Sequence, residues 1–347
     1  MRPWAHASRR DCVRNFQYGY FALIMATGIV SIACHLAGIH FAARVLFILN
    51  NIQYATCLTL AVGKLILTPG SVWRDLTHHE KGPGYLTLVA ATNVLGVQYV
   101  QMTALPAIPM ALFWLGCGLY VVLVNTMLTG VTMAKSKPAL VQGMNGSWLL
   151  CTVSGCSVAV LGSSLSAPAT ASAGFFLFCV GIWAIGIMLY LMVIALAFLR
   201  WLFVPMDDKS FSPTWWINMG ALAISTLAGS HLYTMALSLP RLDVLAPIIL
   251  GISLFLWSAS CWWLVLLVFI LIWRIASRAF TPGYSMQNWS AIFPMGMFCV
   301  ASMSFLPQVG VSYWIPLLHY LFTPVVLVLW TWVFLGLLGM LYRRLKP

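Results

Sequence analysis

Neutral hydroxyl groups are the side chains of this 347-residue chain that are best placed to act on a solute, because they recur inside long apolar segments. Small and polar residues form five clusters, which begin about 60 to 80 residues apart, as in a weak internal repeat. Hydroxyl and backbone N–H groups can offset the desolvation of an anion, so the clusters predict five helices that line a central pathway. Small residues also permit close helix packing, and this alternative stays open. The clusters are Ala26-Thr27-Gly28, Ala91-Thr92-Asn93, Val153-Ser154-Gly155, Ser225-Thr226 and Ala301-Ser302.

Carboxylates are missing from these apolar segments. All six acidic residues fall in loops or tails, namely Asp11, Asp75, Glu80, Asp207, Asp208 and Asp243. Cation coordination and proton relays inside membranes usually depend on Asp or Glu, so the sequence argues against a cation channel and against the common sodium- or proton-driven carriers. The chain carries a net charge of +12, and a path without fixed negative charge in a basic protein favours an anion.

Pro294 is a second clue, because it lies inside the ninth apolar segment, directly after Phe293. Proline removes a helical hydrogen bond and frees a backbone carbonyl about one turn earlier. Transport proteins use such broken helices to expose backbone to a permeating ion. We therefore place Pro294 on the predicted pathway, whereas Pro324 in the last segment is interpreted as a packing kink.

Titratable and cationic side chains give weaker signals. His35, His231 and His319 lie in or near apolar segments and could titrate near neutral pH, but hydrogen-bonded structural histidines are the favoured interpretation. Arg44 and Arg241 are the cations predicted at the outer mouth, where they attract anions or simply snorkel to the interface. The nine cysteines are interpreted as small buried hydrophobes, and neither a metal site nor a cofactor is predicted.

Composition predicts the elements that position these residues. Hydrophobic residues make up 62% of the chain and charged residues 7%, which excludes a soluble enzyme, a secreted disulfide scaffold, a nucleic-acid-binding domain and a disordered chain. A bilayer requires roughly 20 apolar residues per helix. The segments that satisfy this are 17–37, 42–65, 84–103, 107–133, 143–164, 171–200, 214–238, 244–273, 287–306 and 315–341. The predicted fold class is an all-α polytopic membrane protein, with ten transmembrane helices arranged as five hairpins around a central pore.

The distribution of positive charge predicts the orientation. Sixteen of the 18 Lys and Arg residues fall on the side of both termini, and only Arg44 and Arg241 on the other. Positive residues collect on the cytoplasmic side, so both termini are predicted in the cytoplasm and the chain in the cytoplasmic (inner) membrane. We expect a basic tail over 1–16, a membrane domain over 17–342 and a second basic tail over 343–347.

Motifs of soluble catalysis are absent from the sequence. No phosphate-binding loop, nucleophile elbow or zinc-protease motif occurs, so neither enzymatic activity nor ATP-driven pumping by this chain alone is predicted. A membrane-embedded enzyme or a sensor remains the alternative from a different functional class.

Five strings, one in each odd-numbered segment and in order, resemble the tellurite-resistance/dicarboxylate transporter family. This family includes malate permeases, sulfite efflux pumps and the slow-type anion channels of plants. The strings are FALIMATGIVS (21–31), GYLT (84–87) with NVLG (93–96), NGSWLL (145–150), WWINMGA (215–221) and WSAIFPMGM (289–297).

The resemblance implies that the odd-numbered helices surround a pore and that the chain forms a homotrimer, as is frequent in the family. It also places Phe293, in the string Phe293-Pro294-Met295, at the position where a family phenylalanine blocks the pore; without the resemblance, a packed core side chain is the preferred interpretation. The pore-lining candidates are Thr27, Gly28, Thr92, Ser154, Thr226, Pro294 and Ser302.

We therefore expect transport of small anions or malate-like C4-dicarboxylates through a pore gated by Phe293. The alternative is export of sulfite- or tellurite-like oxyanions, with proton coupling through a histidine as a further option. The expected partners are small inorganic or dicarboxylate anions, the lipid bilayer and further copies of the chain, with no nucleic acid. Asn93 and the stretch Ser154-Gly155-Cys156 depart from the bacterial dicarboxylate group, which leaves the substrate open.

Overall fold

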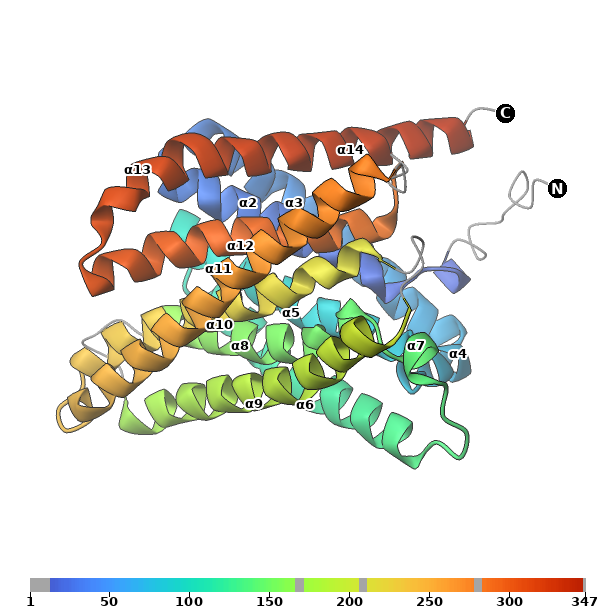
Figure 1. Ribbon diagram of the computed structural model, residues 1–347, viewed down its shortest axis with the longest axis horizontal. Helices are drawn as coiled ribbons and strands as arrows, with labels where there is room; N and C mark the ends of the chain where they lie inside the picture. The colour runs from blue at the N-terminus through green and yellow to red at the C-terminus, as the bar shows by residue number, and fades with distance from the viewer. Residues whose placement is uncertain (1–12, 166–171, 206–210, 278–282, 346–347) are drawn as a thin grey trace.

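The structure is a computed structural model that describes residues 13–165, 172–205, 211–277 and 283–345 (Figure 1). These residues form helices joined by turns, and they contain no β-strand. Most of the predicted basic tail over 1–16 lies outside the described residues. At the other end the last helix continues to Leu345, past the predicted start of the second tail at residue 343.

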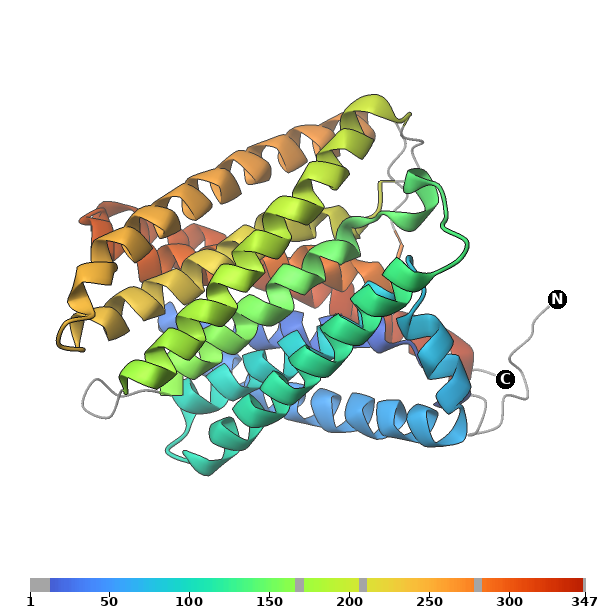
Figure 2. The same cartoon turned by 90° about the horizontal axis from the view of Figure 1, so that it is seen from below.

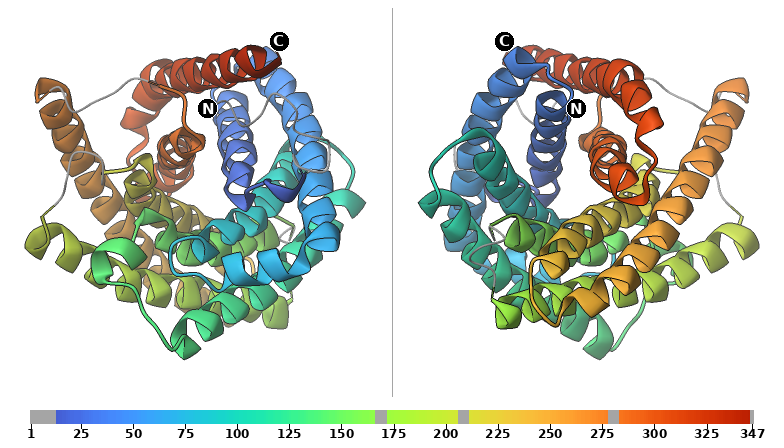
Figure 3. Two further views of the ribbon diagram at one scale, coloured as in Figure 1. Left: turned by 90° about the vertical axis from the view of Figure 1, so that its right-hand side faces the viewer. Right: turned by 90° about the vertical axis from the view of Figure 1, so that its left-hand side faces the viewer.

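Two layers of long helices make up the protein, and Figure 3 shows them end-on. The five inner helices are α2 (Phe21–Leu36), α5 (Leu86–Met102), α8 (Leu150–Leu165), α10 (Ile217–Leu237) and α12 (Trp289–Phe305). The five outer helices are α3 (His40–Leu67), α6 (Ala107–Met133), α9 (Ala173–Phe203), α11 (Ala246–Ala276) and α14 (Thr323–Leu345). The inner and outer helices alternate along the chain, so each consecutive pair forms a hairpin.

The inner helices form a closed ring. Each one packs against the next along the chain, and α12 packs against α2 to complete the circle. Each outer helix packs against its own inner partner and also against the following inner helix, so that α14 reaches α2 (Figure 3). The chain therefore repeats one hairpin arrangement five times around a common axis.

Short 3₁₀ turns precede all five inner helices and form a second ring. These turns are η1 (Tyr18–Tyr20), η2 (Gly82–Tyr85), η3 (Gly146–Leu149), η4 (Pro213–Trp216) and η6 (Met286–Asn288), and each contacts its neighbours around the circle. Gly146 permits one of these contacts, because a Cβ atom at this position would lie 2.2 Å from the carbonyl oxygen of Thr214. The inner helices thus run parallel to one another, with their N-terminal ends gathered at one end of the bundle (Figure 2).

Burial separates the two layers. In the apolar stretches of the inner helices α2, α8 and α12, between 78% and 83% of the residues are buried, whereas the outer helices bury between 22% and 33%. Exposed residues of the outer helices include Phe41, Trp114, Val121, Phe203, Phe255 and Val328. Such a broad apolar surface is stable in a lipid environment and would aggregate in water.

Eight helices of the described chain are long and apolar enough to cross a membrane. The inner helices α5 and α10 are not among these eight. Both carry buried polar side chains, including Thr92, Asn93 and Gln98 on α5 and Asn218 and Ser225 on α10. Because other helices surround them, these side chains need not face lipid. The prediction that α5 and α10 also span the membrane therefore depends on how these two helices pack in the bundle.

The last predicted segment is irregular at its beginning. The short helix α13 (Ile315–Leu317) passes into a π-helical turn over Leu318–Phe322 before α14 begins at Thr323. Pro324 follows at once and lacks the N–H group that a regular helix would use, which accounts for the widened turn. The Thr323 hydroxyl donates to the Leu318 carbonyl oxygen at 3.0 Å and satisfies one group of this turn.

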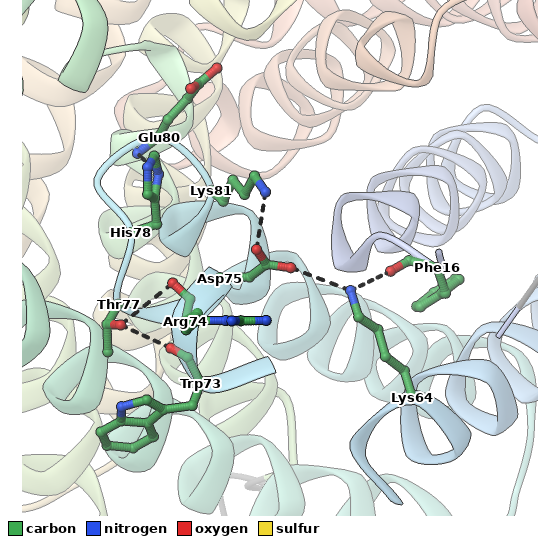
Figure 4. A network of polar contacts seen from close by, with 9 residues as sticks. All are labelled: Phe16, Lys64, Trp73, Arg74, Asp75, Thr77, His78, Glu80 and Lys81. Carbon is green, nitrogen blue, oxygen red and sulfur yellow. Dashed lines mark hydrogen bonds and ion pairs between the residues drawn. The ribbon is translucent and has the colours of Figure 1, made fainter. Parts of the chain in front are cut away.

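A polar network joins the loop helix α4 (Pro69–Leu76) to α3 near the end where the inner helices begin (Figure 4). Lys64 is 5% exposed, and its Nζ atom lies 2.8 Å from the Phe16 carbonyl oxygen and 3.5 Å from Asp75 Oδ2. Lys81 Nζ lies 3.1 Å from Asp75 Oδ1. Asp75 therefore neutralises a buried ammonium group that would otherwise be costly.

Candidate permeation pathway

A cavity of about 50 Å³ lies inside the ring of inner helices, and all five contribute to its lining. A cavity of this size has room for a few water molecules or a small ion. The described residues that line it contain no Asp, Glu, Lys or Arg. They are Ile29, Ile32, Leu36, Asn93, Val94, Val97, Gln101, Ser157, Val160, Ile224, Leu227, His231, Met297, Val300 and Ser304.

Polar lining groups concentrate toward the C-terminal ends of the inner helices. Gln101, His231 and Ser304 are the last lining residues of α5, α10 and α12. Asn93 and Ser157 lie deeper, where Asn93 Nδ2 donates to the Ser157 hydroxyl oxygen at 3.0 Å. The remaining walls are aliphatic, so an ion inside the cavity would rely on a few neutral dipoles.

Phe293 lies on the same face of α12 as the cavity, one turn before its first lining residue. Residues 293, 297, 300 and 304 are spaced by four, three and four, which keeps them on one side of a helix. The Phe293 side chain is 1% exposed. Its ring therefore belongs to the closed section of the bundle, between the cavity and the ring of 3₁₀ turns.

The other inner helices carry small or apolar residues at the corresponding positions, one turn before their cavity-lining residues. These are Met25 on α2, Ala90 on α5, Val153 on α8 and Gly220 on α10, all of them buried. None of these side chains carries a polar group. An ion at this level would meet only hydrocarbon, which makes the section a barrier.

Two glycines bring α12 unusually close to its neighbours around Phe293. A Cβ atom on Gly220 would lie 2.8 Å from the ring of Pro294, and a Cβ atom on Gly296 would lie 2.8 Å from Cγ2 of Ile29. These distances are shorter than van der Waals contact, so both positions require glycine unless a neighbouring helix shifts. Pro294 is thus placed in the contact between α12 and α10, and Phe293 is held between two tight helix contacts.

Three of the hydroxyl groups predicted to line a pore accept hydrogen bonds from the outer layer. Thr27 Oγ1 accepts from Trp330 Nε1 at 3.0 Å, and Ser302 Oγ accepts from Trp257 Nε1 at 2.9 Å. Thr92 donates to its own helix at Leu88, so it accepts from the Tyr54 hydroxyl at 2.9 Å. None of these three hydroxyl groups lines the cavity, and their contribution to a pore stays a prediction.

The same relation occurs at the two remaining clusters. Trp183 Nε1 donates to the Ser225 carbonyl oxygen at 2.8 Å, and the Tyr120 hydroxyl occupies the space beside Gly155, where a Cβ atom would lie 2.8 Å from it. In all five cases an aromatic side chain of one outer helix reaches the cluster on the following inner helix. The small and polar clusters are therefore the positions where the outer layer docks on the inner ring.

The remaining pore-lining candidates also lie away from the cavity. Ser154 Oγ donates to the Cys151 carbonyl oxygen and Thr226 Oγ1 to that of Leu222, each within its own helix. A Cβ atom on Gly28 would lie 2.5 Å from Cγ1 of Val94 and 3.0 Å from Nδ2 of Asn50. Gly28 thus permits close packing of α2 on α5 and α3.

The predicted outer-mouth arginines and the three histidines lie in different environments. Arg44 and Arg241 are both exposed near the C-terminal ends of the inner helices, as a role in attracting anions would require. His231 lines the cavity. The ring of His35 meets the ring of His40 edge to face, with 5.5 Å between the ring centroids, and His319 lies in the π-helical turn.

In the loop after α4, burial and the nearby His78 and Lys137 lower the pKa of His79 below its usual value.

Sequence reasoning missed most of the cavity lining. Asn93 stands within one of the quoted clusters and His231 is titratable, but Gln101, Ser157 and Ser304 give no separate signal in the sequence. The spacing of three and four residues from Phe293 to Ser304 could have identified a lining face, and the lining residues of α2, α5 and α10 have the same spacing.

Comparisons with known proteins find sequence similarity over most of the chain. Residues 15–338 match the family model described as "Voltage-dependent anion channel" (SLAC1). The chain is 23% identical to an uncharacterized transporter of Methanocaldococcus jannaschii over 306 residues, which cover 85% of each chain. It is 26% identical to a sulfite efflux pump of Trichophyton rubrum over 94% of this chain and 92% of the pump. It is also 33% identical to an uncharacterized membrane protein of Mycobacterium tuberculosis, over 33% of this chain and 57% of the relative.

Proposed function

Because this chain belongs to the voltage-dependent anion channel family, we propose that it passes small anions across a membrane along the axis of its five inner helices, through a constriction closed by Phe293. The chain is a multi-pass integral membrane protein of an anion-transporting family. The proposal adds the route, the gate and the selectivity.

One observation carries the proposal. All five inner helices line a single cavity whose described lining residues include no Asp, Glu, Lys or Arg. Phe293 lies on the same face of α12, one turn before the first lining residue of that helix. Neutral donors can hold an anion weakly enough for it to leave again, which conduction requires. An aromatic ring among apolar residues closes such a path sterically and by excluding water, and its rotation would open it.

The orientation and assembly are also proposed. The excess of Lys and Arg on the side of both termini supports cytoplasmic termini and a location in the cytoplasmic membrane. Exposed Arg44 and Arg241 would then stand at the outer mouth and raise the local concentration of anions. The lipid-facing surface of the outer helices is large enough for a homotrimer to bury part of it.

Removal of the Phe293 ring tests the proposed gate. Purified wild-type protein and Phe293→Ala are reconstituted into planar bilayers under an anion gradient, and currents are recorded. We expect small wild-type currents and a large anion-selective current in the variant, since the barrier of hydrocarbon is gone. Phe298→Ala is the matched control: Phe298 lies on the same helix and its ring is 6.3 Å from that of Phe322, away from the cavity face.

Either of two results would contradict the proposal. Equal currents in Phe293→Ala and Phe298→Ala would remove Phe293 as the gate. Silence of the wild type and both folded variants would exclude an open-channel mechanism and favour an electroneutral carrier, a membrane enzyme or a sensor.

Export of sulfite- or tellurite-like oxyanions is the second candidate, and C4-dicarboxylates such as malate belong to the first. The similarity to fungal sulfite efflux pumps over nearly the whole chain supports the second candidate. Efflux of radiolabelled sulfite and of malate from proteoliposomes distinguishes them. Faster sulfite efflux with no malate efflux would favour the oxyanion exporter, and the reverse would exclude it.

A further inference from the structure

Basic residues gather on the surface around α4, at the end of the bundle where the inner helices begin (Figure 1). Arg74 lies on α4 itself, and Lys81 lies on the loop that follows it. Lys135 and Lys137 lie on the loop after α6, and all four residues are exposed. Together with Trp73, the neighbour of Arg74, we call them the α4 patch.

Contacts between the two loops bring these residues to one surface. A Cβ atom on Gly130, in the last turn of α6, would overlap with the side chain of Thr77, so the end of α4 sits directly on the end of α6. Farther along both loops, Lys137 lies close enough to His79 to contribute to the lowering of its pKa. A Cβ atom on Gly143 would lie 3.6 Å from Cβ of His79. The α4 patch is therefore continuous from one loop to the other.

The helix α4 has one face turned to the protein and one turned outward. Val72 and Leu76, four residues apart, are buried, whereas Trp73 is 61% exposed and lies next to the exposed Arg74. Gly82 packs against the inner face, because a Cβ atom at this position would overlap with the Leu76 carbonyl oxygen. A short helix that presents an indole ring and a cation on its outer face is typical of a membrane interface.

The edge of the lipid-facing surface passes directly beside the α4 patch. The outer helix α3 ends with Ile66 and Leu67, both exposed, and α4 begins two residues later. The outer helix α6 ends at Met133, which is 75% exposed and lies two residues before Lys135. Apolar side chains so exposed at the end of an outer helix contact lipid tails. The basic residues that follow them therefore stand at the level of the lipid headgroups.

Carboxylates of the same region leave most of this positive charge uncompensated. Asp75 is already bonded to two lysines. The side chains of Arg74, Lys135 and Lys137 form no ion pair with a described residue. Glu80 is the other acidic residue of the loop, and its carboxylate lies away from Arg74 in Figure 4. Such a cluster of basic groups attracts an anionic surface.

We propose that the α4 patch is a docking surface for anionic phospholipids, such as phosphatidylglycerol, of the membrane leaflet at this end of the protein. The cationic groups of Arg74, Lys135 and Lys137 bind the lipid phosphate groups. The ring of Trp73 rests between the headgroups and the acyl chains. The exposed apolar residues beside the patch favour a lipid over a soluble polyanion, which would find no match for them. This surface is separate from the proposed anion pathway, and its test requires no transport.

Native mass spectrometry of the full-length chain in detergent tests the proposal. The protein is mixed with equal amounts of phosphatidylglycerol and phosphatidylcholine that carry the same acyl chains, and the ratio of the two bound lipids is measured. A basic residue near an anionic surface contributes about a fivefold factor in affinity. We therefore expect the wild type to prefer phosphatidylglycerol, and a triple variant with Arg74→Gln, Lys135→Gln and Lys137→Gln to lose at least about tenfold of this preference. Higher salt should also weaken the preference, since the charges are exposed.

Two controls separate the surface from net charge and from folding. Arg44→Gln combined with Arg241→Gln removes exposed cations from the opposite end of the bundle and should leave the lipid ratio unchanged. The single variants of the α4 patch should each lower the ratio by about fivefold, which keeps the test valid if the triple variant folds poorly.

Three results would overturn the proposal. One is an unchanged lipid ratio in a triple variant that melts at the same temperature as the wild type. Another is an equal loss of preference in the variant at the opposite end, which would show a general effect of net charge. The third is displacement of phosphatidylglycerol by inorganic phosphate, which would assign the α4 patch to soluble anions.

Discussion

Trp330 of α14 donates its indole N–H to Thr27 of α2 at 3.0 Å, and so connects the last long helix to the first across 303 positions of sequence. The corresponding aromatic residues of the other outer helices, Tyr54, Tyr120, Trp183 and Trp257, each reach the following inner helix. This contact therefore closes a circle of five similar contacts. It explains why small and polar clusters recur in every inner helix.

Loss of the closing bond should destabilise the ring. Trp330→Phe keeps an aromatic ring but removes the N–H donor, leaving the buried Thr27 oxygen without its partner from the outer layer. We expect a loss of about 0.5–1.5 kcal/mol in stability, as for one hydrogen bond. Thermal denaturation in detergent measures the change, with Trp332→Phe on an exposed position of the same helix as the control. Equal melting temperatures of the two variants would contradict the role of the bond.

The close contact between Gly220 and Pro294 predicts a coupling between packing and the gate. A methyl group at position 220 would meet the proline ring at 2.8 Å, and a proline ring cannot move aside as a flexible chain can. Gly220→Ala should therefore cost about 1–3 kcal/mol and push α12 away from α10. Because Phe293 is adjacent to Pro294, we also expect a raised basal current.

Gly181→Ala provides the matched comparison for this variant. Gly181 lies on α9 with no atom within 4 Å of an added Cβ atom, so the substitution should be neutral or slightly stabilising. A Gly220→Ala protein as stable and as silent as Gly181→Ala would show that the two helices can separate without consequence.

Asp75 predicts a measurable electrostatic contribution at the end of the bundle where the inner helices begin. Asp75→Asn removes the negative charge beside the buried Lys64 ammonium group, which also donates to the Phe16 carbonyl oxygen (Figure 4). We expect a loss of about 1.5–3 kcal/mol, the range for hydrogen bonds to charged groups. Glu80→Gln removes an exposed carboxylate of the same loop and should change stability little. The two variants are compared by thermal denaturation, and similar losses would argue against a specific role of Asp75.

Arg241 has a strained backbone and an exposed charge at the proposed outer mouth. Its φ angle is +70°, in the left-handed region that disfavours residues other than glycine. Arg241→Gly should raise stability by up to about 1 kcal/mol, while the lost charge lowers anion flux at low ionic strength. Arg44→Gln removes the other exposed charge from a helix and should reproduce the effect on flux alone. Flux that is independent of both arginines, or of salt, would exclude attraction of anions by these charges.

The sequence predicted the membrane class, the helical hairpins and the family from local properties. Apolar segments of helical length, separated by basic loops, require a polytopic helical protein whatever its packing, since unpaired backbone groups are not tolerated in lipid. The strings around Thr27 and Phe293 identified the family in the same way. Neither inference depends on contacts between distant residues.

The tertiary structure decided which face of each helix points inward. Inner and outer helices are both rich in apolar residues, so hydropathy alone does not distinguish a lipid-facing side from a buried one. The rotation of each helix depends on contacts between elements far apart in the chain, such as Trp330 with Thr27 and Pro294 with Gly220. These contacts direct Thr27, Thr92 and Ser302 to the outer layer, and they bring Gln101, His231 and Ser304, from three separate helices, to one cavity.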